Sequence, residues 1–129
     1  MGLFNFFKKD REPLNEAPVE EYWSLTTNAK EITDPAWEQV EAAVKSALPE
    51  QDIFASLGYM NSGLEIEIIQ VTGGEGIYRF EALPPEGSYD YGDIYINDRI
   101  SYDEAIGFFK EFYENQRVVG YRSWETMKI

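Results

Sequence analysis

The chain has 129 residues, with 24 acidic and 11 basic side chains, a net charge of −13, and no histidine or cysteine. Histidine titrates nearest neutral pH and cysteine is the strongest intrinsic nucleophile, so the commonest routes of acid–base catalysis, covalent catalysis and transition-metal binding are absent. The charge also argues against nucleic acid as a ligand, since phosphate binding depends on lysine and arginine. Aromatic residues make up 16% of the chain, which favours a folded domain over a disordered one.

Residues 1–18 are predicted to form a flexible tail in front of a single domain at 19–129. The tail begins with apolar residues, continues with basic ones, and contains Pro13 and Pro18, which interrupt regular structure. This order does not fit a signal peptide, and no apolar run reaches the roughly 18 residues of a membrane span. We therefore expect a cytoplasmic protein without a transmembrane segment. An alternative for the tail is a weak anchor to a membrane surface or to a partner.

The predicted elements alternate between strands and helices along the chain. A strand at 20–27 is rich in aromatic and β-branched residues, and Asp34-Pro35 then resembles the start of a helix, with Asp as the N-cap. Trp37, Val40, Val44 and Leu48 repeat at helical spacing, and Pro49 ends this helix.

Short turns separate the strands that follow. Strands are predicted at 53–60, 64–72, 77–83 and 91–97, with a hairpin loop at Gly73-Gly74-Glu75-Gly76. Ser101 and Glu104 have the spacing of a capping box and begin a helix that runs to about Asn115, and 118–127 is the last strand. The order β-α-β-β-β-β-α-β predicts the α+β class. We expect a mostly antiparallel sheet of about five to six strands with two helices packed on one face.

The strand at 91–97 carries the most suggestive pattern for binding. Tyr91, Asp93, Tyr95 and Asn97 alternate onto one face, while the two isoleucines between them point to the other and are predicted to face the core. Tyrosine offers rigid contact area with a polar tip, and a carboxylate pairs with lysine or arginine. This face is therefore a candidate surface for a basic partner. The alternative is an ordinary solvated sheet face.

Glu65 and Glu67 alternate in the same way on the strand at 64–72 and are predicted to extend the acidic face. Paired carboxylates also occur in glycosidases, but nothing in the sequence marks a sugar-binding cleft. The segment 89–93 has oxygen ligands without the spacing of a calcium loop, and the glycines at 73–76 lack the residues of a phosphate-binding loop. We predict no catalytic residue, no metal site and no cofactor.

The C-terminal segment holds Trp124 among several basic residues. Tryptophan and arginine are enriched in binding hot spots, which makes Trp124 a candidate partner-binding residue. The alternative is that Trp124 packs under the second helix and Arg122 pairs with neighbouring acids.

The segment from Ser101 through Phe108, Phe109, Phe112 and Tyr113 to Trp124 resembles the ending of small bacterial immunity proteins of polymorphic-toxin systems. Those proteins often close with a helix that carries a phenylalanine near its end, a short connector and a strand that contains tryptophan. The front end, Tyr22-Trp23-Ser24-Leu25-Thr26-Thr27 before a helix, is similar too. The resemblance concerns an arrangement over about residues 20–125, and it implies a non-enzymatic inhibitor that occludes the active site of a toxin, often a basic nuclease.

The composition and the resemblance together predict a non-enzymatic acidic domain that binds a basic protein, most concretely a toxin domain. Its partner-binding residues are expected to be Tyr91, Asp93, Tyr95, Glu65, Glu67 and Trp124. The alternative is a structural or regulatory domain of an uncharacterised bacterial family that self-associates through its sheet as a homodimer. An enzyme that acts through carboxylates is a third hypothesis.

Overall fold

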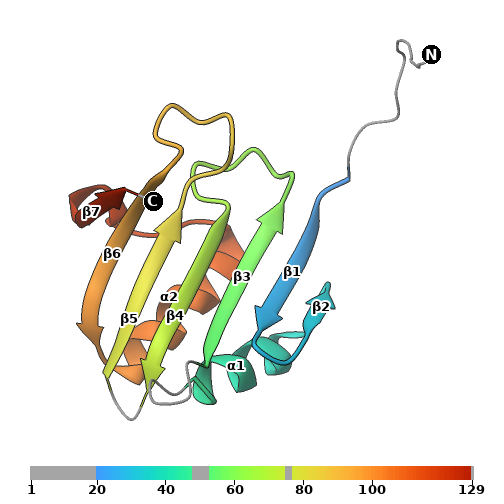
Figure 1. The fold of residues 1–129 in the computed structure, drawn as a ribbon. Coiled ribbons are helices and arrows are strands. Elements are labelled where there is room, and N and C mark those ends of the chain that lie inside the picture. Colours follow the sequence, from blue (N-terminus) through green and yellow to red (C-terminus); the bar gives the residue numbers. More distant parts are fainter. Residues whose placement is uncertain (1–19, 48–52, 75–76, 129) are drawn as a thin grey trace.

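The computed structural model describes residues 20–47, 53–74 and 77–128, which form one antiparallel sheet covered on one face by two helices (Figure 1). The strands are β1 (Tyr22–Thr27), β2 (Glu31–Thr33), β3 (Phe54–Met60), β4 (Ile68–Gly74), β5 (Ile77–Leu83), β6 (Asp93–Ile100) and β7 (Glu125–Lys128). The helices are α1 (Trp37–Lys45) and α2 (Tyr102–Asn115), and a 3₁₀ helix (Tyr121–Ser123) precedes β7. The predicted α+β class is confirmed, with seven strands in the described residues where five to six were expected.

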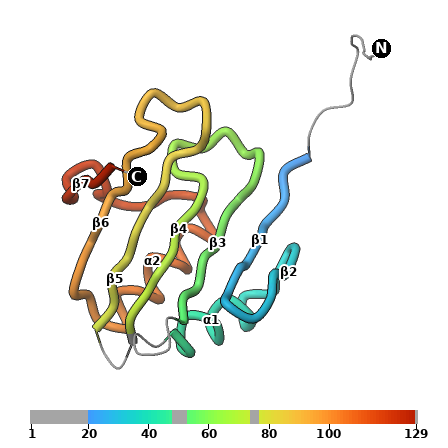
Figure 2. Tube along the Cα trace, in the orientation of Figure 1, coloured from blue at the N-terminus to red at the C-terminus, as the bar shows by residue number. Residues whose placement is uncertain are grey.

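The sheet has the order β2-β1-β3-β4-β5-β6-β7, and every neighbouring pair is antiparallel. Strands β3 to β6 follow one another as a meander, and α1 and α2 make the connections into and out of it, as the trace in Figure 2 shows. The strand missed from the sequence is β2, whose three residues are too few to show an alternating pattern. The predicted tail at 1–18 lies outside the described residues.

Helix α1 begins later than the sequence predicted. Asp34 is not its N-cap, because the Asp34 backbone has a left-handed φ of 52° and its Oδ1 accepts a hydrogen bond from the Trp23 backbone N–H at 3.0 Å. The N-cap is Ala36, whose N–H donates to Oε1 of Gln39 at 2.9 Å. The first helical residue is Trp37, and Pro49, the predicted end of the helix, lies outside the described residues. The Asp34 side chain therefore bonds to β1, although the local sequence pattern predicted that it would cap α1.

Helix α2 follows its prediction closely. Ser101 Oγ accepts a hydrogen bond from the Glu104 N–H at 3.1 Å, and Glu104 Oε1 accepts one from the Ser101 N–H at 2.9 Å. This reciprocal capping box satisfies two backbone donors and stabilises the helix by about 1 kcal/mol. The helix ends at Asn115, and Gln116 follows in the left-handed conformation with its N–H bonded to the carbonyl of Phe112.

The hydrophobic core lies between the two helices and the sheet face they cover. Phe80 of β5 is fully buried and contacts Phe108, Phe109 and Trp124 at ring-centroid distances of 4.8, 5.8 and 5.7 Å. At the other side of the core, the Trp23 ring stacks on Tyr59 at 4.3 Å. The largest fully buried side chains are Phe80, Phe109, Phe112, Leu25, Leu57, Ile69, Val40 and Val44. Neither helix in the described residues has the length and apolar character of a membrane-spanning helix.

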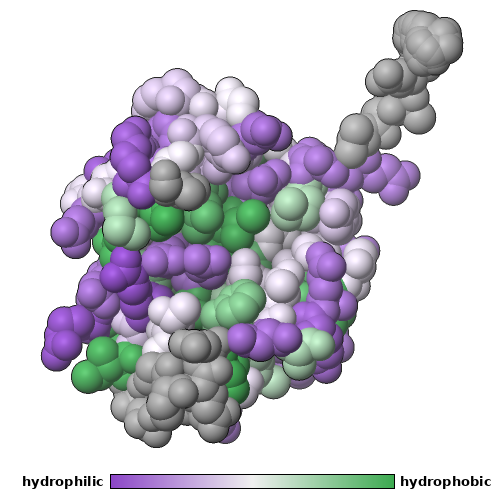
Figure 3. Space-filling view, in the orientation of Figure 1, coloured by the Kyte–Doolittle hydropathy of each residue, from purple (hydrophilic) through white to green (hydrophobic). Residues whose placement is uncertain are grey.

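The face assignment predicted for the strand at 91–97 is wrong. Tyr95 pairs with Ala82, which is fully buried, so Tyr95 lies on the helix-covered face and is only 8% exposed. Ile96 pairs with Glu81 and lies on the opposite, open face, where neighbouring side chains still bury it. Figure 3 shows this open face, on which apolar side chains lie beside polar ones. Both faces of β6 are therefore partly buried, and hydrophobic alternation could not distinguish them.

Three strand boundaries also differ from the prediction. The strand expected at 64–72 begins at Ile68, so residues 64–67 belong to the preceding loop. The strand expected at 91–97 runs over Asp93–Ile100. The strand expected at 118–127 is confined to Glu125–Lys128, because the 3₁₀ helix occupies the residues before it.

Candidate functional site

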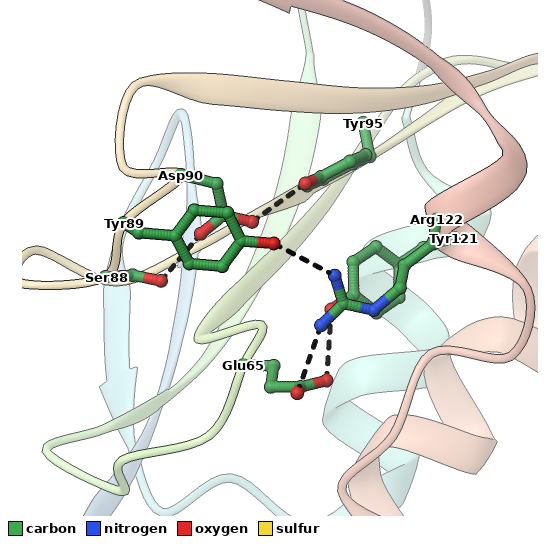
Figure 4. A network of polar contacts seen from close by, with 7 residues as sticks. All are labelled: Glu65, Ser88, Tyr89, Asp90, Tyr95, Tyr121 and Arg122. Carbon is green, nitrogen blue, oxygen red and sulfur yellow. Dashed lines mark hydrogen bonds and ion pairs between the residues drawn. The ribbon is translucent and has the colours of Figure 1, made fainter.

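Two loops and the 3₁₀ helix meet at one end of the sheet. The β3–β4 loop (61–67) and the β5–β6 loop (84–92) leave the sheet at the same end, because Ile68 at the start of β4 pairs with Leu83 at the end of β5 (Figure 1). Chain reversals at one end of an antiparallel sheet bring side chains distant in sequence together. Here they form a polar cluster, the tyrosine network, which consists of Glu65, Ser88, Tyr89, Asp90, Tyr95, Tyr121 and Arg122 (Figure 4).

Asp90 is the buried carboxylate of the tyrosine network, and only 8% of the residue is exposed. Its Oδ1 accepts a hydrogen bond from Ser88 Oγ at 2.6 Å, and its Oδ2 accepts one from the Tyr95 hydroxyl at 2.8 Å. Burial opposes the charged form of Asp90, but these two hydrogen bonds and the nearby Arg122 outweigh that effect and lower its pKa. Asp90 is thus held as a carboxylate, which ties the β5–β6 loop to β6.

Tyr95 and Tyr121 form the inner wall of the network. Their rings contact each other edge to face, with centroids 4.9 Å apart. Burial, together with the hydrogen bond to Asp90, raises the pKa of Tyr95 to about 12. Burial and a 3.1 Å hydrogen bond to Glu65 Oε1 also raise the pKa of Tyr121. Both tyrosines therefore act as neutral hydrogen-bond donors to carboxylates at physiological pH.

Arg122 closes the outer side of the network. Its Nη2 lies 3.0 Å from Oε2 of Glu65, its Nη1 donates to the Tyr89 hydroxyl at 3.4 Å, and its guanidinium lies 5.1 Å from the centre of the Tyr121 ring. The hydrogen bonds to Tyr89 and Glu65 raise the pKa of Arg122, so it is always charged. Arg122 thereby links the two loops to the 3₁₀ helix through one side chain (Figure 4).

The surface above the network exposes aromatic and acidic groups. Tyr89 is 89% exposed and Tyr91 is 56% exposed, although both are large residues with apolar rings. The two loops, the 3₁₀ helix and the adjoining ends of β6 and β7 carry five carboxylates against two cations, which makes this end of the sheet acidic. The carboxylates are Glu65, Glu67, Glu86, Asp90 and Asp93, and the cations are Arg122 and Lys128.

The structure brings some of the predicted site residues together and separates others. Glu65 and Tyr95 both belong to the tyrosine network, but Tyr95 is buried, so its predicted role as a contact residue is wrong. Tyr91 is exposed in the β5–β6 loop beside the network. Asp93 is largely covered, with 17% of its side chain exposed, and pairs with Lys128 at 2.6 Å across β6 and β7.

Glu67 and Trp124 lie outside the tyrosine network. Glu67 Oε2 accepts a hydrogen bond from the Asn61 N–H at 3.3 Å and so closes the β3–β4 loop. Trp124 packs edge to face on Phe80 and Phe108 at the border of the core. These contacts correspond to the alternative weighed from the sequence, in which Trp124 packs under the second helix and Arg122 pairs with an acid.

Sequence reasoning did not select Tyr89, Asp90 and Tyr121. A signal for the first two was present, since Gly87-Ser88-Tyr89-Asp90-Tyr91-Gly92 places aromatic and acidic residues between two glycines. Both glycines have a left-handed φ, near 100°, and so they mark a loop of fixed shape. No local pattern reveals the hydrogen bond between Tyr121 and Glu65, which are 56 positions apart.

No group of three or more carboxylates that could hold a metal ion occurs within residues 20–47, 53–74 and 77–128. Comparison of the chain with protein-family models, with curated proteins and with solved structures finds no match.

Proposed function

We propose that this chain is a non-enzymatic acidic domain that binds a basic protein through the end of the sheet that carries the tyrosine network. The observation that carries the proposal is the exposure of Tyr89 and Tyr91 beside a group of carboxylates. Tyrosine rings give large contact area for little loss of side-chain entropy, and arginine or lysine of a partner pairs with the carboxylates around them. Tyr95 and Trp124 do not contact the partner in this proposal, because Tyr95 is buried and Trp124 packs against Phe80 at the border of the core.

The tyrosine network prepares this surface for binding. Asp90 fixes the β5–β6 loop through two hydrogen bonds, and Arg122 holds the Tyr89 hydroxyl. A loop that is already ordered loses little entropy on association, which leaves more of the interaction energy for affinity. The surplus of carboxylates accelerates encounter with a basic partner by electrostatic steering.

The most concrete form of the proposal is an immunity protein that neutralises a toxin domain in the cytoplasm. It rests on the resemblance in the order of elements and on the acidic surface, since many toxin domains of this kind are basic nucleases. Inhibition would follow from occlusion of the toxin active site by the Tyr89 and Tyr91 surface, with charge pairing at its border.

The test uses the polypeptide encoded by the reading frame next to this gene, with affinity measured by calorimetry and association rates measured at several salt concentrations. Replacing both Tyr89 and Tyr91 by alanine is expected to weaken binding about 100-fold, as for paired hot-spot residues. Glu86→Lys is expected to slow association about tenfold at low salt.

Glu41→Lys, on the exposed side of α1, is the matched control, because it changes the net charge equally at a distant place. We expect Glu41→Lys to leave the association rate within about twofold of the wild type. Equal slowing by the two lysine variants would show that net charge alone matters and would refute the proposed surface.

A second candidate function is self-association through the sheet edge. Strand β7 is the last strand in the sheet order, all four of its residues are exposed, and Met127 is 45% exposed. An edge strand with free backbone groups is a template for pairing with another chain. Sedimentation at increasing protein concentration tests this candidate, since a homodimer through β7 requires a shift to twice the monomer mass.

A further inference from the structure

A groove of about 870 Å³ lies on the open face of the sheet, at the end opposite the tyrosine network. It runs between the start of β3, the end of β4, the start of β5 and the end of β6. Phe54 and Ile77 give it apolar walls, and Ile77 is 51% exposed. Gln70, Arg79, Asp98 and Arg99 supply polar groups, so two guanidinium groups and one carboxylate line the groove. We call it the arginine groove. Its volume is typical of a site for a small organic molecule.

Arg99 has an unusual backbone for an arginine. Its φ is 62°, a left-handed conformation that glycine, asparagine and aspartate adopt more readily than other residues. It lies where the β5–β6 register shifts between Tyr78 and Phe80, and its N–H donates to Oδ1 of Asp98 at 3.0 Å. Non-glycine residues in such conformations cluster at functional sites, because only the surrounding structure maintains them.

The Arg99 guanidinium also has no ion pair or hydrogen bond with any residue in the part of the chain that the structure describes. This is unexpected in a protein with more than twice as many acidic as basic residues. Of the other arginines described, Arg79, Arg117 and Arg122 each pair with a glutamate. The guanidinium of Arg99 therefore remains available to an anion that enters the groove.

Arg79 contributes a second guanidinium of fixed position. Its Nε donates to Oε2 of Glu81 at 2.9 Å, and Gln70 Nε2 donates to the other oxygen of the same carboxylate. Glu81 is therefore occupied on both oxygens. The two terminal nitrogens of Arg79 have no partner in the hydrogen bonds and ion pairs of the described residues, and two such N–H groups match the geometry of a carboxylate or a phosphate.

From the free guanidinium, the left-handed backbone at Arg99 and the apolar walls, we propose that the arginine groove binds a small oxyanion with an apolar group. Arg99 and Arg79 would bind the oxyanion, and Phe54 and Ile77 would contact the apolar group. The arginine groove lies at the other end of the sheet from the surface of the proposed function, so failure of one proposal would not affect the other.

The test titrates the full chain with phenylacetate, phenyl phosphate and phenylacetamide and follows backbone amide signals by NMR. Phenylacetamide has the shape of phenylacetate without its charge. We expect saturable shifts confined to Phe54, Gln70, Thr72 and Arg99 with at least one anion, and none with the amide. The anion that saturates at the lower concentration identifies a carboxylate or a phosphate as the preferred head group. Equal shifts with phenylacetamide, or no shift with either anion, would overturn the proposal.

Arg99→Gly is the variant that separates binding from folding. Glycine adopts the left-handed conformation without strain, so the variant should have a thermal midpoint at or above that of the wild type while it loses the guanidinium. We expect binding of the preferred anion to weaken at least tenfold. Arg117→Gln, which removes a charge that pairs with Glu111 on α2, is the matched control and should bind like the wild type. Wild-type affinity in the Arg99→Gly variant would show that the groove does not use this residue.

Discussion

The two ends of the sheet differ in how their charged side chains are held. In the tyrosine network, Asp90 accepts two hydrogen bonds and Arg122 contacts Glu65, Tyr89 and the ring of Tyr121. In the arginine groove, the guanidinium of Arg99 contacts no described residue through an ion pair or a hydrogen bond. A charge with several partners fixes the shape of its surroundings, whereas a charge without partners contributes little to stability and is available to a ligand. The predictions below test this difference, beginning with the largest effect.

Asp90→Ala should cause the largest loss of stability. It removes the acceptor of two hydrogen bonds and leaves the buried Tyr95 hydroxyl without its partner, which costs about 2 to 3 kcal/mol of unfolding free energy. Urea unfolding at pH 7 measures the loss. Asp98→Ala at the other end of the sheet is the matched control, since Asp98 is exposed and, among the described residues, its side chain bonds only the next backbone N–H. It should change stability by less than about 0.5 kcal/mol, and equal losses in the two variants would contradict the comparison.

The unfolding free energy that Asp90→Ala removes should also depend on pH. The folded protein lowers the pKa of Asp90, so the stabilisation is present above the pKa of the unfolded chain, near 4, and is lost as pH falls through the folded value. The difference in unfolding free energy between the wild type and the variant should therefore become smaller as the pH falls below about 5. A constant difference over this range would mean that the charge of Asp90 is not what stabilises the loop.

Tyr95→Phe should have a smaller effect, about 1 kcal/mol, because the ring packing on Tyr121 is kept and one hydrogen bond is lost. The tyrosinate absorbance of the wild type minus that of the variant should report one group with a midpoint near pH 12, above the ordinary value near 10. Since the folded pKa is raised, this group reduces stability as the pH rises from 10 to 12. A difference midpoint near 10 would place Tyr95 in water and refute its burial.

The fold was predictable from the sequence wherever the signal is local. The capping box of Ser101 and Glu104, the helical spacing around Val40 and Val44 and the turns of the meander all act within a few residues. The element order follows from them, except for β2 and the 3₁₀ helix. Asp34 shows the limit of such reasoning. Its side chain matches an N-cap, yet it bonds the backbone of Trp23 because the β1–β2 pairing brings that group within reach.

The candidate site was less predictable because its contacts are tertiary. Alternation along β6 separated two sets of side chains correctly but did not show which set faces the helices, since tyrosine is buried readily when its hydroxyl has a partner. Asp90 supplies that partner from the preceding loop, and Tyr121 supplies the packing surface. Likewise, Glu65 could be identified as acidic and exposed, but its pairing with Arg122 depends on the position of the 3₁₀ helix.

The smallest expected change in stability is that of Arg99→Gly. Because the Arg99 guanidinium has no described partner, we expect its removal to cause no loss of unfolding free energy. A left-handed backbone costs an L-residue about 1 to 2 kcal/mol, whereas glycine adopts it freely but adds about 0.5 to 1 kcal/mol of entropy to the unfolded chain. Arg99→Gly should therefore match the wild type or exceed its unfolding free energy by up to about 1.5 kcal/mol in urea unfolding. Arg99→Ala removes the same guanidinium but keeps the backbone strain, so it should be no more stable than the wild type.

The pair of Arg99 variants separates the two properties of this residue. Both should lose anion binding, because both lack the guanidinium, but only the glycine variant should gain stability, because only it relieves the backbone. If alanine and glycine are equally stable, the left-handed conformation is unstrained, and the argument from backbone strain to function at this position fails. If both variants lose more than about 1 kcal/mol, the guanidinium has a structural partner, and the contrast between the two ends of the sheet is wrong.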